Sequence, residues 1–123
     1  MTQATIQQLF AKSSQVRKLQ TTIAQTQNNI TLKGLTGSAF SFVISDVFKN
    51  SELPFLLVFN DKEEAAYYLN DLEQLIGEKD VLFYPGSYRR PYQIEETDNA
   101  NVLLRAEVLN RINSRKKPAL IVT

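Results

Sequence analysis

The hydrophobic positions of this chain fall into short unbroken runs, separated by longer stretches with helical periodicity. Residues Phe55 to Phe59 form an unbroken apolar run of strand length, which is typical of a parallel strand covered on both faces. A shorter run over 81–83, an alternating stretch near 31–35 and a final run over 119–122 predict three more strands. The pattern therefore predicts about four short strands along the chain.

Apolar residues at intervals of three and four predict helices between these strands, over about 38–49, 61–76 and 100–114. Asp61 followed by Glu64 forms an N-terminal capping signature, and Gly77 is a suitable C-terminal cap. The first twenty or so residues also have mostly helical spacing, in a background of Gln, Thr and Ser, and predict one loosely held helix.

The alternation of strands with helices determines the predicted architecture. Such an order implies right-handed crossovers and a parallel sheet. We therefore predict an α/β fold with three layers, in which a parallel sheet of about four strands has helices on both faces and a P-loop-like topology. Residues 1–29 are interpreted as an N-terminal helical extension, and residues 30–123 as the α/β domain.

The stretch from Leu32 to Ser41 has the outline of a phosphate-binding loop. A working loop, G-x-x-x-x-G-K-[ST], holds phosphates with backbone N–H groups and a Lys, and holds magnesium with the final hydroxyl. Here Ala39 takes the place of the second Gly and Phe40 the place of the Lys. An aromatic ring cannot neutralise a phosphate. We interpret the segment as a degenerate phosphate loop made of Gly34, Thr36, Gly37, Ser38, Ala39, Phe40 and Ser41, with the Phe40 ring packed on the core.

The composition limits the possible chemistry. The chain has 123 residues, no Cys and no His, which excludes thiol nucleophiles, imidazole acid–base catalysis and zinc-finger sites. We predict no catalytic residue, no metal site and no cofactor. No run of 18 apolar residues occurs, so the chain is expected to be one small soluble domain that does not cross a membrane. The net charge of +1 predicts at most weak non-specific binding to duplex DNA.

Periodicity disappears between Tyr84 and Asn99, where turn-forming residues mix with aromatic and basic ones. The candidate interaction loop comprises Tyr88, Arg89, Arg90 and Tyr92. Tyr rings can stack on bases and Arg can reach phosphates, so direct DNA contact is one interpretation. The acids Glu95, Glu96 and Asp98 follow closely, and docking on neighbouring domains is the interpretation that we favour.

Several motifs in one order resemble a known family. The glycine segment resembles the P-loop region of the excision-repair protein UvrB and, more closely, the N-terminal module of bacterial transcription-repair coupling factors. Further shared motifs are an acidic, Ala-rich helix start, an F-x-P segment, a P-Y pair, an R-x-x-x-L helix and a final I-V-T strand. They correspond here to residues 61–66, 83–85, 91–92, 105–109 and 121–123.

The resemblance covers roughly residues 30–123 and implies that the chain is the first part of a UvrB-like module in a longer multidomain protein. Members of the family are cytoplasmic, ATP-driven DNA translocases that displace stalled RNA polymerase and recruit UvrA. The resemblance therefore implies a non-catalytic interaction or scaffold module, whose full-length protein has neighbouring domains, UvrA, RNA polymerase and DNA as partners. The alternatives are a small nucleotide-binding domain and a DNA-binding α/β domain.

Overall fold

In the part of the chain that the structure describes, the sheet has three parallel strands, in the order β1-β3-β2. The computed structural model describes residues 2–25, 29–86, 99–115 and 118–123. Strand β1 comprises Phe55–Leu57, β2 comprises Val81–Phe83 and β3 comprises Leu120–Val122. Leu120 of the central strand lies opposite Phe55 on one side and Val81 on the other. The predicted parallel pairing is confirmed, and the mixture of helices with a small open parallel sheet is compatible with the predicted α/β class.

Five helices accompany the sheet in the described part of the chain: α1 Gln3–Ala11, α2 Ser14–Ile23, α3 Ala39–Lys49, α4 Lys62–Ile76 and α5 Asn99–Ser114. The predicted ends of α4 are confirmed. The Asp61 side chain accepts a hydrogen bond from the Glu64 backbone N–H at 2.7 Å, and the Glu64 side chain accepts one from the Asn60 N–H at 3.1 Å. Gly77, at φ 109°, ends the helix.

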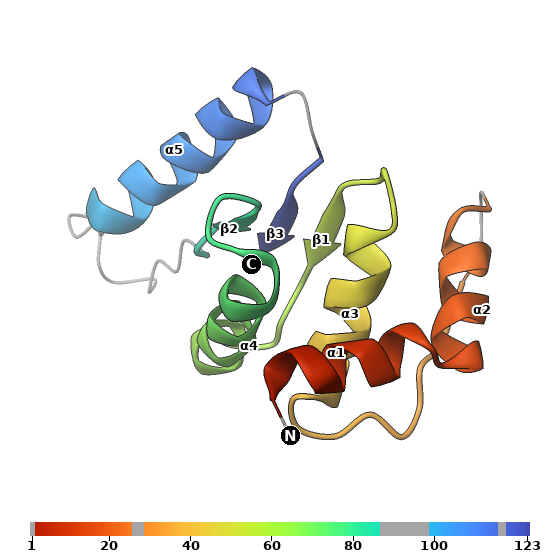
Figure 1. Ribbon diagram of the computed structural model, residues 1–123. Coiled ribbons are helices and arrows are strands. Elements are labelled where there is room, and N and C mark those ends of the chain that lie inside the picture. Colours follow the sequence, from red (N-terminus) through yellow and green to blue (C-terminus); the bar gives the residue numbers. More distant parts are fainter. Residues whose placement is uncertain (1, 26–28, 87–98, 116–117) are drawn as a thin grey trace.

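Helices lie on both faces of the sheet, as predicted (Figure 1), with α3 and α4 on one face and α5 on the other. On one face, Leu120, Val122 and Val81 pack with side chains of α3 and α4, among them Ile44, Phe48 and Leu72. On the other face, Leu82 and Ala119 pack with Val108 of α5. Residues 120 and 122 of β3 thus face one layer and residue 121 faces the other, which follows from the two-residue period of a strand.

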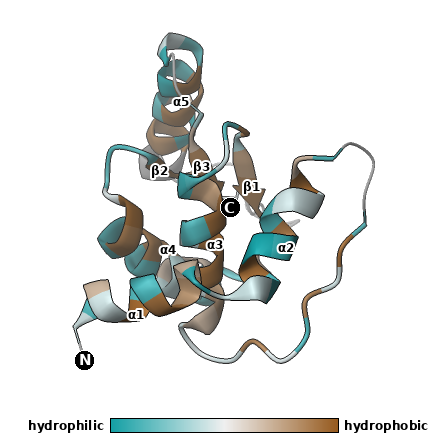
Figure 2. Ribbon diagram, turned by 45° about the vertical axis from the view of Figure 1, so that its right-hand side comes forward, coloured by the Kyte–Doolittle hydropathy of each residue, from teal (hydrophilic) through white to brown (hydrophobic). Residues whose placement is uncertain are grey.

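The N-terminal segment packs on the side of α3 that faces away from the sheet. Most residues of α3 are hydrophobic (Figure 2). Val16 and Leu19 of α2 are buried with Val43 and Val47, and the Phe10 ring of α1 stacks on Phe42 at 5.4 Å. The prediction of one loosely held helix was wrong, because the helix is interrupted at Ser13, whose backbone is extended. The break allows α1 and α2 to turn separate apolar faces toward α3. The division at residue 30 stays a prediction.

The strand predicted near 31–35 is not formed, so the described sheet has three strands and not four. Residues 29–38 instead follow an irregular path below the helices (Figure 1), with Ile30 and Leu32 exposed. A strand depends on a partner for its ladder of hydrogen bonds, and the alternating pattern here is too short to supply stability alone. The P-loop-like topology, which requires a strand before the loop, is therefore also absent at this point.

Candidate functional site

The glycine segment lies on the surface and turns directly into α3. Gly34 and Gly37 have φ values of 84° and 55°, in the left-handed region where glycine is favoured. The Ala39 N–H donates to the Thr36 carbonyl at 3.1 Å and closes the turn. Ser38 precedes the helix but makes no side-chain capping bond. The segment has the glycines of a phosphate loop, but no strand leads into it.

The Phe40 ring belongs to an aromatic cluster, together with Tyr68 of α4 and Phe59, which follows β1. Its centroid lies 5.2 Å from that of Tyr68 and 6.4 Å from that of Phe59, both in edge-to-face geometry. The rings of Phe59 and Tyr68 stack at 4.9 Å. Phe40 packs against the main core, as its helical spacing predicts. Where a working loop directs a Lys at phosphate, this chain has a ring that contributes to packing.

Ser41, the counterpart of the magnesium-holding hydroxyl, is fully buried. Its Oγ donates to Asp71 Oδ2 of α4 at 3.0 Å. This bond brings a carboxylate to the first turn of α3, where negative charge interacts favourably with the helix dipole. Asp71 thus supplies the negative charge that a phosphate would bring to this helix end, and its carboxylate would repel a phosphate.

A pocket of about 280 Å³ opens beside this helix end, between α1, α3 and α4. Its lining consists of Gln3, Ile6, Ser38, Phe42, Asp71, Gln74 and Leu75. The Gln3 side chain of α1 donates to the Gln74 carbonyl at 3.2 Å, so α1 is held against α4 at this point. Because the one charged side chain in the lining is a carboxylate, the pocket is unsuited to a nucleotide phosphate.

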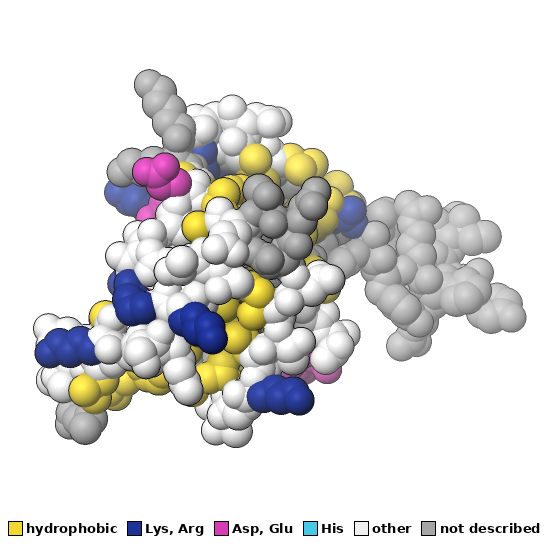
Figure 3. Space-filling view, turned by 90° about the vertical axis from the view of Figure 1, so that its right-hand side faces the viewer, with side chains coloured by type: hydrophobic (Ala, Val, Ile, Leu, Met, Phe, Trp, Pro, Cys, Tyr) yellow, Lys and Arg dark blue, Asp and Glu magenta, His cyan; other side chains and the backbone are white. Residues whose placement is uncertain are grey.

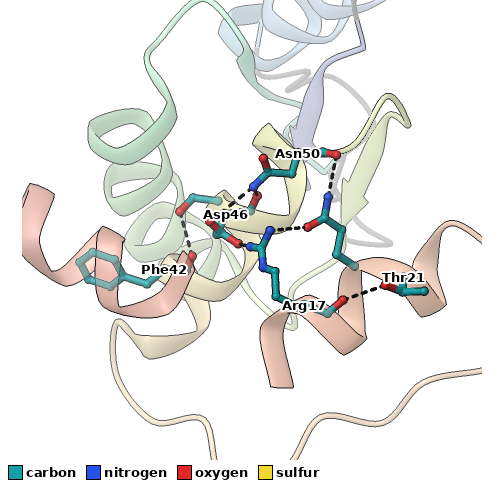
Figure 4. A network of polar contacts seen from close by, with 7 residues as sticks. Arg17, Thr21, Phe42, Asp46 and Asn50 are labelled. Carbon is teal, nitrogen blue, oxygen red and sulfur yellow. Dashed lines mark hydrogen bonds and ion pairs between the residues drawn. The ribbon is translucent and has the colours of Figure 1, made fainter. Parts of the chain in front are cut away.

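A polar network connects α2 with α3 (Figure 4). The Arg17 guanidinium donates to Asp46 Oδ2 and, at 2.7 Å, to Gln20 Oε1, while the Gln20 amide donates to the Asn50 carbonyl at 2.8 Å. The Asp46 side chain is only 13% exposed, so this ion pair is partly shielded from water. Sequence reasoning missed the network, because its two charged members are separated by 29 residues.

The candidate interaction residues Tyr88, Arg89, Arg90 and Tyr92 lie outside the described residues. Tyr84, which precedes that segment in the chain, contacts α5: the Arg105 guanidinium lies over its ring, 4.8 Å from the centroid. This cation–π contact and the packing around Val108 hold α5 against the end of β2.

An apolar surface that the sequence did not reveal lies on the α5 side of the molecule. We call it the outer apolar surface and define it by Leu56, Val58, Leu103 and Leu109, which are 64%, 73%, 70% and 53% exposed. The unbroken run over 55–59 predicted cover on both faces. That prediction was wrong for β1, because α5 packs over β2 and leaves the outward side chains of β1 bare.

The described residues hold no group of three or more acidic side chains that could bind a metal ion. None of the helices in the described ranges has the length and hydrophobicity that a membrane span requires.

The fold and the glycine segment define a small α/β domain in which Phe40 packs on the core and Ser41 binds the Asp71 carboxylate at the start of α3. Among curated proteins, the chain is similar to the transcription-repair-coupling factor of Rickettsia bellii (strain RML369-C), with 29% identity over 83 residues. The match covers 67% of this chain but only 7% of that relative, and it supports a distant relationship. No family model and no solved structure matches the chain.

Proposed function

We propose that this chain is a non-catalytic interaction module of a transcription-coupled DNA repair factor. The observation that carries the proposal is the similarity to a transcription-repair-coupling factor over two thirds of the chain. The loop supports the non-catalytic part, because Phe40 packs on the core and Asp71 binds Ser41 at the helix end where a phosphate would lie.

The chain spans a small part of that relative, so the activity of a whole coupling factor belongs to this proposal and not to the findings. In the proposal, the longer protein moves along DNA, displaces stalled RNA polymerase and recruits UvrA in the cytoplasm. This chain contributes a folded surface on which other parts of that protein, or UvrA, assemble. The UvrB-like character of the module is part of the same proposal.

The outer apolar surface is the part of the molecule that best fits such a docking role. Leu56 lies in the edge strand β1, Val58 follows the end of that strand, and Leu103 and Leu109 lie on α5. Burying one such side chain in an interface contributes about 1.5–3 kcal/mol. Leu56 and Val58, two positions apart along the chain, would therefore favour association with an apolar face of a neighbouring domain.

A binding experiment between the purified chain and the remainder of a coupling factor tests this role. We expect Leu56→Lys and Val58→Lys to abolish association, because a Lys placed in an apolar interface has no partner for its charge. The matched control is Leu9→Lys on α1, since Leu9 is 55% exposed and lies away from β1 and α5. Association that survives both β1 variants, or that is lost equally with Leu9→Lys, would refute the assignment of this surface.

Calorimetry with MgATP tests the rival interpretation as a nucleotide-binding domain. We expect no dissociation constant tighter than about 1 mM, equivalent to about 4 kcal/mol of affinity. The double change Ala39→Gly and Phe40→Lys restores the letters of the loop motif, but it leaves Asp71 in place and restores no strand before the loop. It is therefore expected to leave ATP binding undetectable. Binding by the unchanged chain would show that the loop still functions.

A further inference from the structure

Charge is divided unevenly between the two halves of this protein. Residues 2–49 contain five Lys and Arg side chains and a single acid, Asp46, whereas residues 50–123 contain nine bases and twelve acids. Asp46 is mostly buried and is paired with Arg17, so it contributes little negative potential at the surface. The nearly neutral total therefore conceals an excess of positive charge that comes from Lys12 after α1, from α2 and from the segment before α3.

Three lysines in this part of the chain are exposed: Lys12 ends α1, Lys18 lies on α2, and Lys33 lies in the segment that leads to α3. We call these three residues the lysine face. Within the described ranges none of them is in an ion pair, in contrast to Arg17. Figure 3 looks onto this side of the molecule and shows Lys and Arg side chains spread over its lower half, with Asp and Glu only toward its margins.

We propose that the lysine face binds the phosphate backbone of duplex DNA. Lys side chains, together with Ser, Thr and Gln groups, are the usual contacts to phosphate oxygens, and α2 supplies such groups in Gln15, Thr21 and Thr22 around Lys18. These contacts position a protein on DNA without reading its sequence, so the binding is non-specific. The charge distribution alone indicates an anionic partner. The choice of DNA over an acidic protein rests on the proposed role in DNA repair.

The number of lysines gives the expected salt dependence of this contact. Each neutralised phosphate contributes a slope of about −0.9 to the dependence of log K on log salt, so three lysines give about −2.7. The binding constant should then fall about 40-fold between about 50 mM and 200 mM salt. The contact is weak at physiological salt, as the net charge predicts, and would act beside stronger DNA contacts elsewhere in a longer protein.

Fluorescence anisotropy of a labelled duplex, titrated with the purified chain at several salt concentrations, tests the proposal. The test variant changes Lys12, Lys18 and Lys33 to Gln. The matched control changes Lys62, Lys79 and Arg111 to Gln, which removes the same charge from exposed positions elsewhere. Circular dichroism establishes that both variants remain folded. We expect the test variant to lose most of the salt slope and at least tenfold in affinity at low salt, and the control to lose less than threefold.

Equal losses of DNA affinity in the two triple variants, or an unchanged salt slope in the test variant, would overturn the proposal that the lysine face binds DNA. A polyglutamate peptide that binds the same three lysines at least as tightly as the duplex would assign the face to an acidic protein and overturn the DNA proposal. Either result leaves the docking proposal standing, because the β1 variants and a different partner test it. Conversely, if the chain does not associate with the remainder of a coupling factor but still binds DNA through the three lysines, the proposed docking function is refuted and the proposal for the lysine face stands.

Discussion

Replacing Phe40 by Ala tests whether the degenerate loop is a packing element or a ligand site. The Phe40 side chain is partly buried against the main core and makes edge-to-face contacts with Tyr68 and Phe59. At a true phosphate-binding position, truncation would weaken a ligand and leave the free energy of unfolding nearly unchanged. At a packing position, truncation lowers the free energy of unfolding whether or not any ligand is present.

The structure determines the expected size of the effect. Full burial of a Phe contributes about 1.5–3 kcal/mol, and the partial burial of Phe40 reduces this to about 1–2 kcal/mol. The edge-to-face pair with Tyr68, at 5.2 Å, adds about 0.5–1 kcal/mol. We therefore expect Phe40→Ala to lower the free energy of unfolding by about 1.5–3 kcal/mol. This is somewhat less than the loss of about 3–5 kcal/mol that is typical of a fully buried Phe.

Urea denaturation followed by far-ultraviolet circular dichroism measures this loss, since the chain has no Trp. With a slope of about 1–3 kcal/mol per molar urea, the midpoint should fall by about 0.5–3 M. Val58→Ala is the matched control, because Val58 is 73% exposed and should change stability by less than about 0.5 kcal/mol. If Phe40→Ala costs no more than this control, the ring does not pack as described and the reasoning about the loop fails.

Two further predictions concern charged groups. Arg17→Ala leaves the shielded Asp46 carboxylate without its partner and should lower the free energy of unfolding by about 1–3 kcal/mol. The double variant, Arg17→Ala with Asp46→Ala, should lose clearly less than the sum of the two single variants. A double-mutant cycle measured by urea denaturation that shows no coupling would contradict this. Burial, and secondarily Glu78, raises the pKa of Glu73 in the folded protein, so the folded state holds this proton more tightly and stability falls as pH rises through the raised pKa. Glu73→Gln should therefore raise the melting temperature above that of the unchanged chain, and the gain should be larger at neutral pH than at mildly acidic pH. The same dependence of melting temperature on pH in both proteins would exclude the effect.

Local chemistry allowed the sequence by itself to determine much of this fold. The ends of α4 follow from Asp61, Glu64 and Gly77, whose capping bonds involve residues only a few positions apart. The three strands that form are unbroken apolar runs, the pattern that is typical of parallel strands. The loss of the loop's Lys was likewise readable from one position, and the spacing of Phe40 with Ile44 predicted that its ring faces the core.

Features that depend on distant partners were decided by the tertiary structure. The stretch 31–35 has strand-like alternation, but no neighbouring strand pairs with it, so it remains irregular. The bare side chains of Leu56 and Val58 result from the position of α5 over β2, which no local pattern specifies. The bonds from Ser41 to Asp71 and from Arg17 to Asp46 span 30 and 29 residues. Periodicity shows which side of a helix is apolar, but only the packing of the chain determines which charged group lies opposite another.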